Sequence, residues 1–166
     1  MSLLGVARNC RQNPIPIHSK GIEMPTRKSS AVWEGGLKGG KGNYRLGSTG
    51  ASANYNFGSR FEEGVGSNPE ELLAAAEAAC YSMALSGSLE KNGTPPTRIS
   101  TSAECTVEKV DDRFTITRMK LDVDATVPNI DDAKFQELAK STLTGCPVSR
   151  ALQNNMEFEI SARLTS

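Results

Sequence analysis

The chain has 166 residues, and its 19 lysines and arginines balance its 19 aspartates and glutamates. This length fits one domain with its own core, and the zero net charge predicts no nucleic acid and no anionic membrane as partner. Four cysteines are too few for a scaffold built on disulfides. We expect neither an apolar run long enough to cross a bilayer nor a secretory signal, and therefore a cytoplasmic protein.

The first part of the chain is rich in proline and glycine. Residues 1–28 lack any sustained periodicity, which predicts an irregular arm before a single domain of residues 29–166. We expect short strands over 30–34 and 51–57, with hairpin turns and loops in the glycine-rich segment between them. This segment nearly matches a phosphate-binding P-loop, but Gly42 stands where that motif needs serine or threonine, so a flexible turn is the better interpretation.

The clearest helix start in the chain lies at Ser67 and Asn68, which are residues that cap helices. Pro69 suits the first helical position, and the two glutamates after it suit the positive end of the helix dipole. From Leu72 to about Leu89 the residues are apolar or small nearly all round. This pattern predicts a helix that is buried on most of its faces.

Alternation of apolar and polar residues predicts strands over 99–108 and 114–125 on either side of a turn. Within the second strand the apolar residues change from even-numbered to odd-numbered positions, which indicates a β-bulge near Thr117–Arg118. We expect an amphipathic helix over 131–141, a short helix from Cys146 to about Gln153 and a final strand over 156–164. Because the strands come in runs, the predicted class is α+β with an antiparallel sheet.

The cysteines differ in their local settings. Cys80 lies in the alanine-rich helix, where a buried cysteine is often only a small apolar side chain, whereas Cys146 begins a helix, a position that favours the thiolate. If the fold brings them together, they form a dithiol that can reduce a peroxide. Cys10 is expected to be an incidental exposed thiol, and Cys105 a small apolar side chain among the apolar positions of its strand. His18 is the only histidine, so neither a Cys–His pair nor a zinc site is expected.

Four segments carry a resemblance to a known family: RFE at 60–62, GSNPEEL at 66–72, AACYSMAL at 78–85 and GCPVS at 145–149. In order and spacing they closely resemble the OsmC/Ohr family of thiol-dependent hydroperoxide reductases, and the OsmC branch above all. The resemblance covers the chain from about Ala31 to its end. It implies an intertwined homodimer in which antiparallel sheets pack around long central helices, with the active sites at the subunit interface.

The resemblance also implies the roles of four residues. Cys80 matches the cysteine that attacks the peroxide and Cys146 the resolving cysteine, while Arg60 matches the arginine that holds the thiolate and Glu70 the carboxylate that orients it. The implied substrates are organic hydroperoxides and, more weakly, hydrogen peroxide. The implied reductant is a dihydrolipoyl-type or small dithiol, and no cofactor is expected. Glu77 departs from the histidine that OsmC proteins often carry and is expected to tune substrate preference.

The spacing of the four residues favours a site built from two chains. Ten residues separate Glu70 from Cys80 on one predicted helix, which is about 15 Å along its axis. A carboxylate that orients an arginine beside Cys80 therefore fits more easily if it comes from a second subunit. Two other classes of protein stay open: a redox sensor or binding protein whose disulfide is a signal, and a structural dimer with inert thiols. Sustained turnover with a dithiol would distinguish the enzyme from both.

Overall fold

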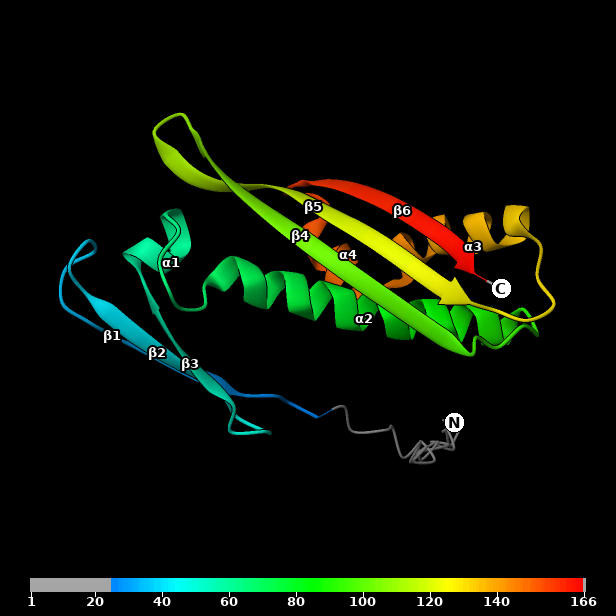
Figure 1. Cartoon of the computed structure of the whole chain (residues 1–166), viewed down its shortest axis with the longest axis horizontal. Coiled ribbons are helices and arrows are strands. Elements are labelled where there is room, and N and C mark those ends of the chain that lie inside the picture. Colours follow the sequence, from blue (N-terminus) through cyan, green and yellow to red (C-terminus); the bar gives the residue numbers. More distant parts are fainter. Residues whose placement is uncertain (1–24, 166) are drawn as a thin grey trace, which may run out of the picture.

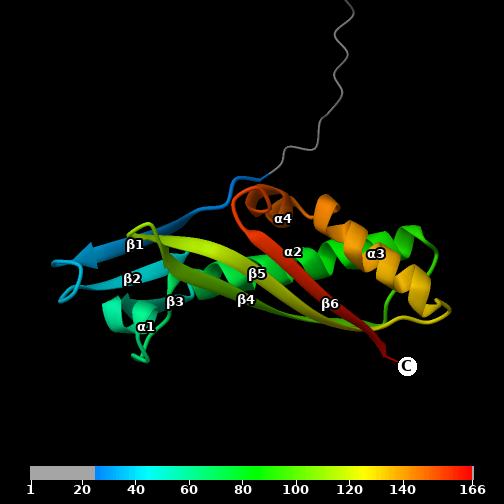
Figure 2. The ribbon, with the colours of Figure 1, turned by 90° about the horizontal axis from the view of Figure 1, so that it is seen from above.

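The structure, a computed structural model, describes residues 25–165. Two residues discussed above, Cys10 and His18, lie outside this range. The described chain contains two three-stranded sheets and four helices (Figures 1 and 2), which agrees with the predicted α+β class. The first sheet lies at one end of the long helix α2, and the second sheet packs along it.

The first sheet is an antiparallel hairpin series of β1 (Ser29–Glu34), β2 (Lys41–Leu46) and β3 (Ser52–Asn56). The two outer strands confirm the predictions, whereas β2 lies in the segment that we expected to be only turns and loops, so that prediction is wrong. Gly42 in β2 pairs with Trp33 and Tyr55, and the absence of a side chain there lets the two rings approach to 5.4 Å between centroids. A strand, not a helix, follows the P-loop-like segment, which confirms that it is a turn.

A short helix that sequence analysis missed, α1 (Phe57–Phe61), connects the first sheet to α2. Its first turn is closed by a capping box in which the Asn56 side chain accepts a hydrogen bond from the Ser59 backbone N–H, 2.9 Å away, and the Ser59 hydroxyl accepts one from the Asn56 N–H. Phe61 then stacks on Phe114 near the tip of the following hairpin, with ring centroids 4.2 Å apart. This helix therefore fixes the position of Arg60, which lies in its last turn.

The long helix α2 (Pro69–Lys91) begins where the sequence predicts. The Asn68 side chain accepts a hydrogen bond from the Glu71 backbone N–H at 2.8 Å, and Pro69 occupies the first helical position. The predicted burial on most faces is wrong for the single chain, because only one face packs against other elements. The side chain of Met83 is 77% exposed, and three alanines of the same apolar face are also exposed: Ala75, Ala76 and Ala79.

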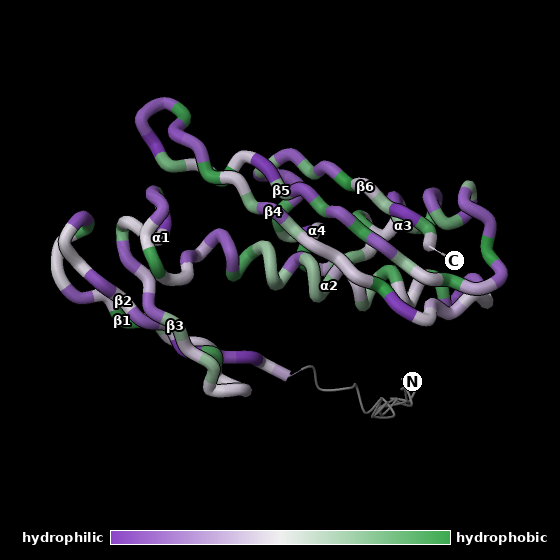
Figure 3. The backbone as a smooth tube through the Cα atoms, in the orientation of Figure 1, coloured by the Kyte–Doolittle hydropathy of each residue, from purple (hydrophilic) through white to green (hydrophobic). Residues whose placement is uncertain are grey.

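Figure 3 shows polar residues at the start of α2 and pale or green, more apolar residues along its centre. By length and composition alone α2 is apolar enough to cross a membrane, which corrects the expectation that no segment is. The central helix of a globular protein can have the same mean hydropathy. Here one face of α2 carries the core residues Tyr81, Leu85 and Leu89, so the helix belongs to the folded domain.

The second sheet has the order β4 (Arg98–Val110), β5 (Arg113–Thr126), β6 (Glu157–Thr165). Strands β4 and β5 are antiparallel, and Thr117 is the extra residue in their register, which confirms the predicted bulge. Strand β6 runs parallel to β5, so the prediction of a purely antiparallel sheet is wrong. The parallel direction follows from the crossover connection formed by α3 (Asp132–Gly145) and α4 (Pro147–Leu152).

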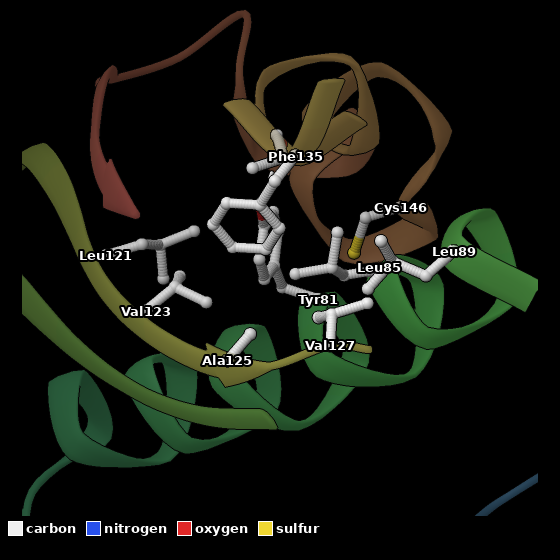
Figure 4. Close-up of a cluster of buried hydrophobic side chains, with 10 residues drawn as sticks. Tyr81, Leu85, Leu89, Leu121, Val123, Ala125, Val127, Phe135 and Cys146 are labelled. Atoms are coloured by element: carbon white, nitrogen blue, oxygen red, sulfur yellow. Dashed lines mark hydrogen bonds between the residues drawn. The ribbon is translucent and has the colours of Figure 1, made fainter. Parts of the chain in front are cut away.

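Helices α2 and α3 cover one face of the second sheet (Figure 2), and the core lies between these two layers. In β5 the buried residues alternate with polar ones, as expected for a strand with one face on the core. Figure 4 shows that residues of α2, β5 and α3 meet in one cluster. The fully buried apolar residues of this cluster are Tyr81, Leu85, Leu89, Leu121, Ala125, Phe135, Ala139 and Cys146.

Candidate active site

Two predicted site residues, Cys80 and Cys146, lie together in the fold. Cys80 projects from the middle of α2, and Cys146 is the residue between α3 and α4, where it caps the start of α4. Pro147 takes the first position of α4 and forces the chain to turn there, so that the Cys146 side chain enters the core. Figure 4 shows its sulfur directed toward α2 beside Leu85. Both cysteines are free thiols, and Cys80 packs against the buried cluster that contains Cys146.

Burial raises the pKa of the Cys80 thiol, because the apolar surroundings disfavour the thiolate. The backbone N–H of Val148, in the first turn of α4, donates to the sulfur and acts in the opposite direction. The neighbouring Cys146 raises the pKa of Cys80 further, and so would Glu77 in its ionised form. The single chain therefore holds Cys80 in a setting that keeps it protonated, and a positive charge is needed to make it a strong nucleophile.

A buried carboxyl group lies one turn before Cys80 on α2. Glu77 is 0% exposed, and its Oε1 accepts a hydrogen bond from the Ser149 hydroxyl of α4 at 2.5 Å. Burial raises the pKa of Glu77. Sequence analysis noted Glu77 only as a departure from the family pattern and assigned Ser149 no role. The position of Ser149, three residues after Cys146, could have indicated that it faces the same side of α4's first turn.

The other two predicted residues, Arg60 and Glu70, form an ion pair at the start of α2. Arg60 Nη2 lies 2.8 Å from Glu70 Oε1, and Arg60 Nε lies 3.2 Å from both carboxylate oxygens. The Glu70 side chain is 7% exposed and the Arg60 side chain 34%. Such two-pronged contacts fix the guanidinium plane, so Glu70 holds Arg60 in one orientation.

The structure brings the four residues together as two pairs, not as one cluster. Arg60 is absent from the groups that shift the pKa of Cys80 within the described chain. The distance between the pairs follows from the helix itself, because Glu70 and Cys80 are ten residues apart on α2, or about 15 Å along its axis. An arginine held by Glu70 therefore does not reach Cys80 of its own chain.

Two cavities adjoin Arg60. One, of about 280 Å³, is lined mainly by aromatic and aliphatic side chains of β1, the β1–β2 turn, β3 and α1, namely Trp33, Leu37, Tyr55, Phe57 and Phe61. The other, of about 330 Å³, is lined by charged and small apolar side chains, with Glu70 and Cys105 among them. Burial raises the pKa of Cys105, as it does that of Cys80. Between residues 25 and 165, no three histidine, cysteine or acidic side chains are grouped as a metal would require.

Comparison with known proteins gives consistent results. The family described as OsmC-like protein matches residues 62–161. The chain is 44% identical to the peroxiredoxin OsmC of Escherichia coli over 134 residues, which cover 80% of this chain and 94% of that protein. It is 30% identical to YmaD of Bacillus subtilis over 60% of this chain and 69% of that one.

Solved structures share the fold at lower sequence identity. An OsmC-like protein from Mycoplasma pneumoniae matches with a TM-score of 0.66 at 14% identity, over 86% of this chain and 99% of that one. The organic hydroperoxide resistance protein OhrB of Bacillus subtilis matches with a TM-score of 0.62 at 20% identity, over 82% and 98% of the two chains.

Proposed function

The chain belongs to the OsmC family, and from this premise we propose that it is a cysteine-based peroxidase that reduces organic hydroperoxides to alcohols. The observation that carries the proposal is that Cys80 packs against the buried cluster that contains Cys146, so that the two free thiols are neighbours. Two neighbouring thiols can give two electrons to a peroxide and close to a disulfide with little movement of the chain.

The reaction proceeds in two steps. The Cys80 thiolate attacks the terminal oxygen of the hydroperoxide, the O–O bond breaks, and the alkoxide takes up a proton and leaves as the alcohol. Cys80 is then a sulfenic acid. The Cys146 sulfur attacks it, water leaves, and the Cys80–Cys146 disulfide forms. Two electrons from an external dithiol return both cysteines to thiols.

A homodimer completes this site in the proposal. Arg60 and Glu70 come from one subunit, and Cys80 and Cys146 from the other. Three observations support this arrangement. Within residues 25–165, no cation of its own chain acts on Cys80. The Arg60–Glu70 pair is too far along α2 to supply one, and the apolar face of α2 around Met83 is exposed. A guanidinium beside Cys80 would offset the cost of burying the thiolate.

The cavity beside Arg60 supports organic hydroperoxides over hydrogen peroxide. Its aromatic and aliphatic lining, with Trp33 and Phe57 among the side chains, gives an alkyl or aryl group a surface to bury, whereas hydrogen peroxide has none. The complete burial of Cys146 supports a small or flexible dithiol as reductant, because a bulky monothiol cannot reach the disulfide.

We further propose a cytoplasmic protein in which residues 29–166 form one domain after an arm of residues 1–28. Four cysteines in 166 residues are too few for a disulfide scaffold, which supports a reducing compartment. A redox sensor, in which the same disulfide acts as a signal, remains the second candidate, since it needs the same pair of thiols.

Steady-state turnover tests the proposal. With dihydrolipoamide as the donor, the protein should consume cumene or tert-butyl hydroperoxide faster than hydrogen peroxide, and dithiothreitol should support turnover far better than glutathione. Cys80→Ser should abolish peroxide consumption, whereas the matched variant Cys105→Ser should keep it. A single stoichiometric oxidation without turnover in any dithiol would favour the sensor instead.

A further inference from the structure

The buried carboxyl group of Glu77 has no part in the two-step scheme above. It is 0% exposed, and among residues 25–165 its Oε2 atom has no hydrogen-bond partner. A buried polar atom without a partner is rare in folded proteins, because leaving it unpaired costs free energy. This atom lies beside the two thiols, since Glu77 precedes Cys80 by three residues on α2 and bonds to Ser149 of α4.

The surroundings of Glu77 determine its protonation state. No cation pairs with it in the described part of the chain, and the charged form of a carboxyl group without such a partner is strongly disfavoured inside a protein. Its raised pKa agrees with this. The Ser149 hydroxyl donates to Oε1, so the acid proton belongs on Oε2. Glu77 is thus a neutral acid whose proton is not used in any hydrogen bond.

Other nearby donors are already occupied. The Tyr81 hydroxyl, one residue beyond Cys80, donates to the Ala139 carbonyl oxygen at 2.7 Å, and burial raises its pKa. The Ser149 hydroxyl donates to Glu77 itself. Of the titratable groups around the thiol pair, which are Cys80 and Tyr81 on α2 and Cys146 before α4, none offers a free acidic proton of comparable strength. The proton on Glu77 Oε2 is therefore the one available for donation at the thiol pair.

We propose that Glu77 is the proton donor to the hydroxide that leaves Cys80 when the disulfide forms. This inference rests on the proposed peroxidase function. The S–S bond forms as the Cys146 sulfur attacks Cys80, and the S–O bond of the sulfenic acid breaks with its electron pair on oxygen. The Glu77 proton converts the departing hydroxide to water, and the thiol proton that Cys146 loses restores Glu77. No other reactant is consumed.

The test separates the two chemical steps. Glu77→Gln keeps the shape of the side chain and an oxygen that can accept from Ser149, but removes the acid proton. After one equivalent of cumene hydroperoxide, sulfenic acid should form on Cys80 at the parent rate. Disulfide closure should be slower by about 100-fold, the low end for a positioned general acid, and the persisting sulfenic acid should be trapped by dimedone. Glu90→Gln, on an exposed residue of the same helix, is the matched control and should close at the parent rate.

A second measurement uses the parent protein, so the test does not depend on the variant folding. The rate of disulfide closure should fall as the pH rises through the pKa of Glu77, because the ionised carboxylate has no proton to donate. Closure of Glu77→Gln within about threefold of the parent, loss of sulfenic acid formation in that variant, or a parent rate that only rises with pH would each overturn the proposal. Failure of the parent to form any Cys80 sulfenic acid would instead refute the peroxidase function.

Discussion

Arg60 and Glu70 are joined by a two-pronged ion pair with a shortest distance of 2.8 Å, and this pair lies at the start of the same helix that carries Cys80 near its middle. The pair is rigid because Glu70 is buried and contacts the guanidinium through both of its oxygens. It is also incomplete, because the arginine has no anion other than Glu70 to bind in the described chain.

The first prediction concerns the resolving thiol. Cys146→Ser should still reduce one equivalent of cumene hydroperoxide and should then hold a sulfenic acid on Cys80, because no neighbouring thiol remains to condense with it. Mass spectrometry of the oxidised parent should find an intrachain Cys80–Cys146 disulfide. A disulfide that uses Cys105 would contradict the assigned roles.

The second prediction concerns Arg60. Arg60→Ala should raise the apparent pKa of Cys80 and slow its alkylation by iodoacetamide at pH 7 by at least about tenfold, which corresponds to one unit of pKa. Arg60→Lys should recover only part of the rate, since lysine keeps the charge but loses the planar fork. Arg163→Ala, which removes an exposed ion pair with Asp124, serves as the control. An unchanged alkylation profile in Arg60→Ala would exclude Arg60 from the site.

The third prediction is that two inactive variants restore each other. Mixed dimers of Cys80→Ser and Arg60→Ala chains, made by unfolding and refolding them together, should contain one complete site and regain up to about half of the parent activity per dimer. This follows because a dimer has two equivalent interfacial sites related by its two-fold axis. An active monomer by light scattering, or verified mixed dimers without activity, would show that one chain holds the whole site.

The fourth prediction links Glu77 to stability. Burial raises the pKa of Glu77 above its ordinary value of 4.5, so the folded protein keeps a proton that the unfolded chain releases. The stability contributed by this group is fully present below about pH 4.5 and is lost as the pH rises through the folded-state pKa. Glu77→Gln stays neutral, so its free energy of unfolding relative to the parent should increase with pH. Urea unfolding at pH 4 to 8 measures this difference, and a constant difference would contradict a buried neutral Glu77.

Local signals explain which elements could be predicted from the sequence. The start of α2 depends on Asn68 and Pro69, which act within one helical turn. The bulge at Thr117 is visible in its own strand, because the apolar residues change there from even-numbered to odd-numbered positions. The direction of β6 depends instead on how α3 and α4 return the chain, and alternation alone carries no direction. Strand β2 was not predicted because Gly42 is typical of a turn when it is considered alone. Its place in a strand becomes clear only from its pairing with Trp33 and Tyr55 on the neighbouring strands.

The same distinction applies to the site. The family resemblance identifies Cys80 and Cys146 by the segments around them, and the structure makes the two thiols neighbours. The bond between Glu77 and Ser149 joins residues 72 positions apart, so no local pattern could predict it. The separation of Arg60 from Cys80, in contrast, was predictable, because the rise of a helix is fixed.

The position of Cys146 between α3 and α4 means that oxidation changes the connectivity of the chain. A Cys80–Cys146 disulfide closes a covalent ring that contains all of β4, β5 and α3. By the loss of chain entropy in the unfolded state, a ring of this size stabilises the fold by about 4 kcal/mol. The oxidised protein should therefore resist heat and proteases better than the reduced one, and an exhausted supply of dithiol would leave the enzyme inactive but in its most durable form.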